Sequence, residues 1–276
     1  MKIFLSILVI QFAFNGLSHA DPDEAVLENS DIEQVQPALQ SDPFLQAEYL
    51  FHSGEVLEAK TFYHDYLSRN PSGKRSYQAL FRLGLIDQSS RSFSSAIRFY
   101  QILLERFSKS ILTNSARFNM AVCHYELADY DHAEALFQKV LRSSPIKKSK
   151  WEAMVYLARI DEGRMNYEKA FSKLKKVYGQ VEDKEIRQHA VTVTKNLINE
   201  KIGVTQASAL IQKFGNGFPV DHLLLKEISF FREAGHISNY VASVEKFIEA
   251  FPNHPRKAEV GGWLDAIKES AETKVK

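Results

Sequence analysis

The chain has 276 residues, of which 45% are hydrophobic and 25% are charged, a balance typical of a soluble globular protein with one or two domains. Its 35 lysines and arginines and 34 aspartates and glutamates give a formal net charge of +1. General nucleic-acid binding depends on a strong positive field. A nearly neutral chain lacks that field, so we expect no nucleic-acid partner.

The first twenty residues have the composition of a secretory signal peptide. Lys2 precedes an apolar run over residues 3–14, and Ser18-His19-Ala20 follows. Small residues at the last and third-last positions suit cleavage after Ala20. A membrane anchor is the alternative, but the run is shorter than the ~20 residues that span a bilayer. We expect residues 1–20 to be cleaved, leaving a mature protein that starts at Asp21 and has no integral membrane segment.

The composition beyond Ala20 points to a periplasm. Residues 21–41 carry several acids, two prolines and no lysine or arginine, which predicts a solvated acidic linker. The single cysteine, Cys123, cannot form a disulfide within the chain, and free cysteine is usually a small buried hydrophobe. Small secreted domains are often rich in disulfides. Export without disulfides therefore favours a periplasmic protein, in which Cys123 packs in the core.

A repeat of 37 residues organises the chain after the linker. Its reference column consists of alanines: Ala59, Ala96, Ala133, Ala170 and Ala207. Three residues before each alanine stands a large apolar or aromatic residue: Val56, Phe93, Tyr130, Tyr167 and Val204. Four residues after it stands another: Tyr63, Tyr100, Phe137, Leu174 and Ile211. Small residues precede the first four alanines by twelve positions: Ala47, Gly84, Ala121 and Ala158.

Each unit predicts two antiparallel helices joined by a short turn. Apolar residues such as Phe93, Ala96, Ile97 and Tyr100 follow helical spacing. Small residues let paired helices approach closely, and aromatic residues fill the space between successive pairs. A proline such as Pro145 ends the second helix because it lacks an amide hydrogen and clashes with the preceding turn. The fold class we expect is all-α.

The order of small residue, aromatic, alanine, aromatic and proline resembles the tetratricopeptide repeat, whose basic unit has 34 residues. The resemblance implies a right-handed α-solenoid whose units stack over one continuous core. Units one to four occupy residues 42–179. Degenerate units five and six with a capping helix occupy 180–270, and 271–276 form a tail. In unit five Lys195 replaces the small residue, which indicates either a bend between two lobes or ordinary drift in an interior repeat.

No catalytic motif is found. The chain has no phosphate-binding glycine loop, nucleophile elbow or H-E-x-x-H motif. Cys123 and His124 are a poor chelate, because adjacent helix residues point about 100° apart. We expect a protein without enzymatic activity, cofactor or metal.

Two surfaces are candidate partner-binding sites. The resemblance implies that first helices line a concave groove, and their inward positions are Phe81, Arg82, Phe118, Asn119, Tyr125, Tyr156 and Arg159. Aromatics and arginine are enriched at interfaces, although an aromatic stripe at helical spacing also fits a core. A basic patch at Lys147, Lys148 and Lys150 is the second candidate, with ordinary solvated lysines as its alternative.

The chain is similar to repeat domains of bacterial envelope proteins, namely the Tol-Pal coordinator, the outer-membrane assembly lipoprotein and the activators of cell-wall synthases. The similarity implies a periplasmic scaffold that binds a protein partner in its groove. The alternative is an accessory or ligand-capture module for cell-wall synthesis or transport, which takes a peptidoglycan fragment or a small ligand. A convergent polar pocket would favour that alternative, and a long aromatic groove would favour a protein partner.

Overall fold

The structure is a computed structural model that describes residues 42–273, so the predicted signal peptide and acidic linker lie outside the described residues. Within residues 42–273 the chain forms thirteen helices and no strand. None of these helices combines the length and apolar character needed to cross a bilayer. The chain divides into two compact units, residues 1–153 and 154–276. The division falls inside one helix, upstream of the sequence boundary at residue 180.

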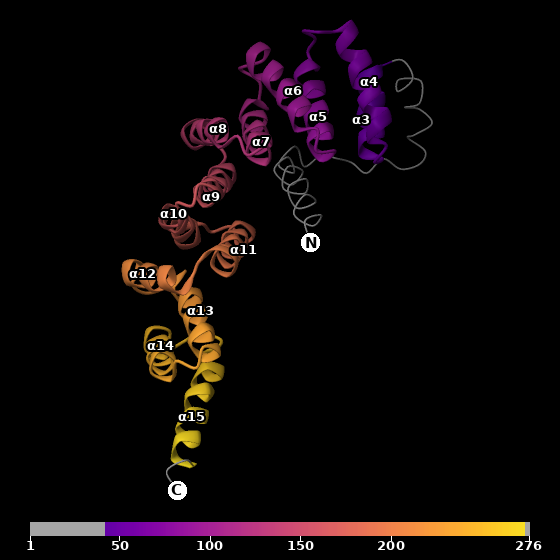
Figure 1. The fold of residues 1–276 in the computed structure, drawn as a ribbon. Coiled ribbons are helices and arrows are strands. Elements are labelled where there is room, and N and C mark those ends of the chain that lie inside the picture. The colour runs from indigo at the N-terminus through magenta and orange to yellow at the C-terminus, as the bar shows by residue number, and fades with distance from the viewer. Residues whose placement is uncertain (1–41, 274–276) are drawn as a thin grey trace. The chain divides into compact units, whose positions relative to one another are not determined.

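Unit 1 is a stack of antiparallel helix pairs. Helices α3 and α4, α5 and α6, and α7 and α8 pack as pairs, while α4 packs on α5 and α6 on α7 (Figure 1). The helix bounds are α3 Pro43–His52, α4 Val56–Arg69, α5 Ser76–Ser89, α6 Phe93–Arg106, α7 Thr113–Glu126 and α8 Tyr130–Ser143. The first turns of α9 (Lys147–Gly163) complete unit 1.

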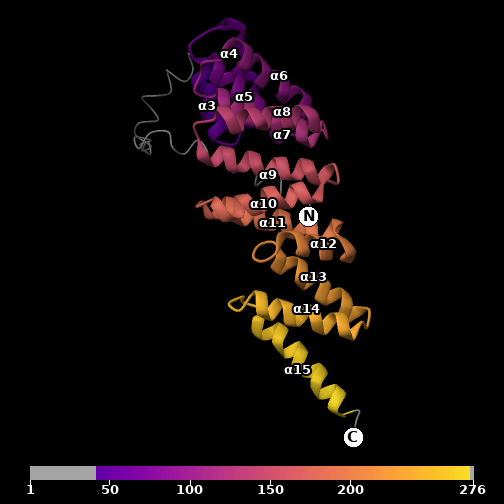
Figure 2. The same ribbon diagram turned by 90° about the vertical axis from the view of Figure 1, so that its left-hand side faces the viewer.

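Unit 2 continues the helix series from the rest of α9 to the C-terminal helix. Figure 2 shows its helices following one another in chain order. Helices α12 and α14 both pack against α13, and α15 packs against α14. The bounds are α10 Tyr167–Gln180, α11 Lys184–Lys201, α12 Val204–Phe214, α13 Val220–Glu233, α14 Ile237–Ala250 and α15 Lys257–Thr273.

The 37-residue period sets where the second helices begin. Helices α4, α6, α8, α10 and α12 start at the residue that stands three positions before the reference alanine: Val56, Phe93, Tyr130, Tyr167 and Val204. The five reference alanines are 0% exposed. A larger side chain at these positions would therefore push packed helices apart.

The turn between the two helices has the same backbone form in each of the first four repeats. Gly54, Arg91, Ala128 and Met165, spaced by 37 residues, have φ values between 59° and 87°. The next residue donates its amide to the carbonyl five positions earlier, as in Ser92 N to Asp87 O at 2.8 Å. A left-handed residue with such a bond ends a helix by satisfying its last carbonyls. Each of these first helices therefore stops at the same point of the repeat.

The fifth repeat does not have this left-handed turn. Ile202, between α11 and α12, has φ −94° and ψ 118°, and Gly203 is also extended. Unit six has its second helix at Ile237, and Tyr240 fills the alanine column there while only 3% exposed. The sixth repeat keeps the left-handed turn, since Gly235 has φ 69° and His236 N donates to Phe231 O at 2.9 Å. The fifth repeat therefore differs in its turn, and the sixth differs in the residue that fills its alanine column.

Candidate functional site

Three of the predicted groove residues are packed in the protein interior. Phe81 is 3% exposed, Asn119 4% and Tyr156 3%. Phe81 contacts the ring of Tyr100, with centroids 5.9 Å apart. Asn119 hydrogen-bonds the same tyrosine and opposes the rise that burial imposes on the pKa of Tyr100. Their burial favours a packing role, and partner binding at Phe81, Asn119 and Tyr156 stays a prediction.

Arg82, also predicted to line the groove, belongs to an internal ion pair. Its Nε and Nη2 donate to the carboxylate of Glu48 at 2.9 and 2.8 Å. Tyr63 Oη donates to the same carboxylate at 2.5 Å. Burial favours the neutral acid, but Arg82 and Tyr63 outweigh burial and hold the pKa of Glu48 below its ordinary value. Arg82 thus links α5 to α3 within unit 1.

The remaining groove residues are half-buried and belong to different units. Phe118 meets Phe137 edge-on at 5.6 Å, and Tyr125 lies 5.9 Å from Tyr130. These contacts are in unit 1, whereas Arg159 lies over the ring of Tyr156 at 5.5 Å in unit 2. Partner binding at Phe118, Tyr125 and Arg159 stays a prediction.

The predicted basic patch lies at the start of α9, in unit 1. Lys147 is exposed, and Lys148 and Lys150 are half-buried. Lysines also recur at positions 173, 175 and 176 of α10, in unit 2, where Lys173 pairs with Asp161 and Lys175 donates to Phe214 O at 3.0 Å. Lys173 and Lys175 therefore bind within their own unit. Binding of a partner by the α9 lysines stays a prediction.

The structure reveals a basic pocket in unit 2 that the sequence analysis missed. It is a cavity of ≈ 510 Å³ between α11, α13 and the turn that joins α14 to α15. We call it the unit 2 pocket. Its lining residues are Lys195, Ile198, Asn199, His222, Leu225, Lys226, Ser229, His254, Pro255 and Arg256. Three of these side chains carry positive charge, two are histidines, and no lining residue is acidic.

The polar groups of this pocket are positioned by α13, by the last turn of α11 and by the turn before α15. Lys226, on α13, donates to Ile198 O and, at 3.1 Å, to Asn199 O. These carbonyls belong to the last turn of α11, where backbone acceptors have no partner within the helix. Lys226 therefore fastens α13 to the end of α11. Arg256 donates to Glu259 at 2.7 and 2.8 Å and lies over the ring of Trp263.

The electrostatics of the unit 2 pocket disfavour a further positive charge. Burial first, and then the charges of Lys195 and Arg256 and the neighbouring His254, lower the pKa of His222 against the opposing pull of Asp221. Asp221 Oδ2 lies 3.7 Å from His254 Nε2 and 4.0 Å from His222 Nε2. A pocket of this size suits a small group rather than a whole helix. Its charge suits an anion, such as a carboxylate.

Sequence signals for this pocket were present but weak. Lys195 stood out only as a misfit in the small-residue column, and its side chain is exposed in α11. His254 and Arg256 lie in a turn that follows no 37-residue period, so no column pointed to them. Their meeting depends on how α11 packs near α13, which periodicity does not specify.

Comparisons with known proteins support the fold. The tetratricopeptide repeat family model matches residues 115–145, which include α8 and most of α7. A tetratricopeptide repeat protein from Parabacteroides merdae is similar with a TM-score of 0.50 and 16% identity, over 85% of this chain and 89% of that one. No curated protein matches the sequence.

Two further solved structures are similar at a lower score. The C-terminal part of a repeat-containing protein from Cytophaga hutchinsonii has a TM-score of 0.49 and 15% identity, over 91% of this chain and 98% of that one. The Pseudomonas aeruginosa pilF protein has a TM-score of 0.46 and 14% identity, over 82% and 98%.

The fold and the matched repeat define the class of protein. The chain is an all-α solenoid of the tetratricopeptide repeat type, as its sequence columns predicted. Residues 115–145 are a tetratricopeptide repeat. This fold is one that binds protein partners, since stacked repeats present extended surfaces.

Proposed function

We propose that the protein is a periplasmic scaffold of the bacterial cell envelope that binds an acidic segment of a protein partner at the unit 2 pocket. The periplasmic location rests on the signal-peptide composition of residues 1–20. The repeat fold supports a protein partner. The acidic character of the bound segment rests on the lysines and arginine that line the pocket.

One observation carries the proposal. Lys195, Lys226 and Arg256 come from three separate elements and line one cavity of ≈ 510 Å³, and none of its lining residues is acidic. A carboxylate entering the cavity gains a charge-assisted hydrogen bond from Lys195, whose side chain is exposed, and such bonds are stronger than neutral ones. Lys226 and Arg256 already bind the end of α11 and Glu259, and they add positive charge beside the bound carboxylate. Ile198, Leu225 and Pro255 line the same cavity and add apolar contact for the neighbouring part of the segment.

Recovery of the partner from crosslinked envelopes of the native host tests the proposal. Lys195→Gln with Arg256→Gln should remove partner capture, because two cations leave the pocket while the helices remain. Lys184→Gln with Lys246→Gln is the matched control, since both lysines are exposed and neither lines the cavity. Capture by the control and by the wild type, but not by the pocket variant, is the expected result.

The groove and the basic patch serve as competing sites in the same experiment. Tyr125→Ala with Arg159→Ala tests the groove, and glutamines at Lys147, Lys148 and Lys150 test the patch. Loss of capture in either variant, with capture retained by the pocket variant, would move the partner site away from the unit 2 pocket. Circular dichroism of each variant separates lost binding from lost structure.

The same pocket supports a second candidate function, capture of an anionic small ligand such as a peptidoglycan fragment, which is the alternative that a convergent polar pocket favours. Small-ligand sites usually have volumes of a few hundred Å³, and the volume of this pocket is of that order. Calorimetric titration with a muropeptide that bears free carboxylates tests this candidate. Binding of the muropeptide that is lost in the pocket variant would favour ligand capture over a protein partner.

A further inference from the structure

The turn between α7 and α8, in unit 1, gathers two histidines and an aspartate. His124 Nδ1 lies 2.8 Å from Asp129 Oδ2, and His132 Nδ1 lies 2.9 Å from Asp129 Oδ1. The three donor atoms all lie within 4.8 Å of one another. The two imidazole rings stack at 5.2 Å with an angle of 22° between their planes. Each of the two rings therefore directs its Nδ1 atom at the carboxylate of Asp129.

The backbone brings these three residues together around one turn. His124 lies in the last turn of α7, Asp129 is the N-cap of α8, and His132 follows in the first turn of α8. Asp129 N donates to His124 O at 2.9 Å, and the left-handed Ala128 closes the turn between them. A site held on two helix ends by backbone bonds loses little freedom when it binds a ligand.

The chemistry of the cluster matches zinc. Zinc binds imidazole nitrogen at about 2.0–2.1 Å and carboxylate oxygen at about 2.0–2.2 Å, in tetrahedral geometry. Tetrahedral ligand atoms then stand roughly 3.3 Å apart, so the 2.8 and 2.9 Å contacts need to open by about half an ångström. Calcium and magnesium prefer sites built from several oxygen ligands. This cluster offers one carboxylate and two imidazoles.

The neighbouring cysteine is not a fourth ligand. Cys123 is 0% exposed and packs in the hydrophobic core with Ala96, Tyr100 and Ala116, so it does not belong to the exposed cluster at the turn. The fourth position belongs to water, because the side chain of His132 is 72% exposed and that of Asp129 is 39% exposed.

We propose that His124, Asp129 and His132 form a binding site for one zinc ion that bridges the end of α7 to the start of α8. The metal displaces the hydrogen bonds by which the two Nδ1 atoms face Asp129. Each neutral imidazole that carries its proton on Nδ1 moves that proton to Nε2 when it becomes a ligand. The ion then connects α7 to α8, the two helices of the third repeat, across their turn. This turn lies inside the segment that matches the repeat family.

Calorimetric titration of the mature, untagged protein with zinc chloride tests the site. We expect one zinc ion per chain with a dissociation constant in the micromolar range or tighter. Substituting residues that only hydrogen-bond the metal ligands typically weakens metal affinity by about 10–100-fold. Asp129→Asn and His132→Gln remove ligands and should each weaken binding by about 100-fold or more. Asparagine retains the capping role of Asp129, and melting of the metal-free variants should therefore match the wild type.

His236→Gln is the matched control, because His236 is an exposed histidine that also stands at a helix N-cap. It should bind zinc like the wild type. Proton–nitrogen correlation spectra of the imidazoles give a second readout, with coordination through Nδ1 and protons on Nε2 in both His124 and His132. No binding at millimolar zinc, unchanged affinity in the His132 variant, or sulfur in the zinc X-ray absorption spectrum would overturn the proposal.

Discussion

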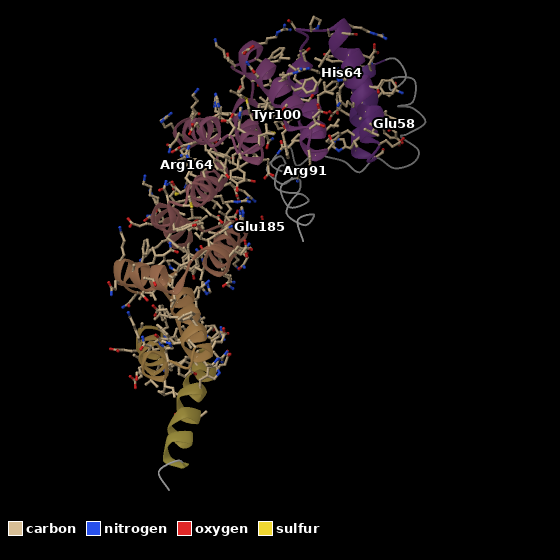
Figure 3. The ribbon with its side chains drawn as sticks, in the orientation of Figure 1. Glu58, His64, Arg91, Tyr100, Arg164 and Glu185 are labelled. Atoms are coloured by element: carbon tan, nitrogen blue, oxygen red, sulfur yellow. The ribbon has the colours of Figure 1, made fainter. Side chains whose placement is uncertain are left out.

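A Cβ atom on Gly84 would lie 2.3 Å from Cε1 of Tyr100, a separation that packed side chains do not reach. Gly84 is in α5 and Tyr100 is in α6, so the two helices of this unit meet where the glycine has no side chain. Tyr100, which is labelled in Figure 3, also donates through Oη to Gln88 Oε1 at 2.9 Å, and this bond anchors the ring. The small-residue column of the repeat is thus a consequence of close helix approach.

Gly84→Ala should destabilise the protein, because the new methyl group must displace a fully buried tyrosine. Overpacking typically costs ~1–3 kcal/mol. Gly179→Ala is the control, since Gly179 lies in α10 with open space around its added Cβ, and alanine in a helix is favoured by roughly 0.5–1 kcal/mol. Urea unfolding should give opposite signs for the two changes. A neutral Gly84→Ala would mean that the helices are further apart than described.

The left-handed turn positions predict a second pair of opposite effects. Gly54→Ala adds a Cβ that touches nothing within 4 Å, so its cost is backbone strain alone, about 1–2 kcal/mol. Met165 has φ 61° and is 74% exposed, so Met165→Gly relieves strain and loses little packing. Thermal melting should show a lower midpoint for the first variant and a higher midpoint for the second. Identical shifts of one sign would contradict the turn geometry.

Acid should weaken unit 1 through Glu48. Its pKa is held below the ordinary value of 4.5, so its ionisation stabilises the folded state at pH values above 4.5. That contribution is lost as the pH falls from 4.5 through the lower folded pKa. Removing a hydrogen bond to a charged group costs about 1.5–3 kcal/mol, so Glu48→Gln should be less stable at pH 7. The variant should also lose part of the decline between pH 5 and pH 3.

Chemical denaturation across this pH range provides the measurement for Glu48. The difference between wild type and Glu48→Gln should shrink as the pH falls. A constant difference from pH 7 to pH 3 would show that the carboxylate does not depend on Arg82 and Tyr63 for its ionisation.

Export is a prediction from residues that the structure does not describe. Mass spectrometry of the mature protein from the native host should find Asp21 at the N-terminus. The physical basis is the single cation, the short apolar run and the small residues before the cleavage point. A soluble protein that retains Met1 would contradict both export and the periplasmic location.

The sequence predicted those parts of the fold that depend on period. The alanine column marked buried contacts in the first five repeats, and even Ala207 of the degenerate fifth repeat is 0% exposed. The start of each second helix also followed the columns. These features were predictable because a repeated contact leaves the same residue type at the same spacing.

What the sequence did not predict depends on contacts without period. Arg91 and Ala128 adopt left-handed backbone although neither is glycine, because the helix-ending bonds impose it. Tyr156, which was predicted to line the groove, is buried. Its burial was not predicted, because helical spacing alone cannot tell an interface from a core. The unit 2 pocket and the histidine cluster arise where helix ends meet, and such meetings leave no column.

Site-specific photocrosslinking in the native host tests the proposed partner site most directly. A photoreactive residue at Ser229, which lines the unit 2 pocket, should crosslink to a partner, and the same residue at exposed Glu245 on α14 should not. Adding Lys195→Gln and Arg256→Gln should abolish the crosslink from Ser229. A crosslink from Ser229 that survives loss of both cations, or a stronger crosslink from Tyr125 with none from Ser229, would contradict binding at the unit 2 pocket.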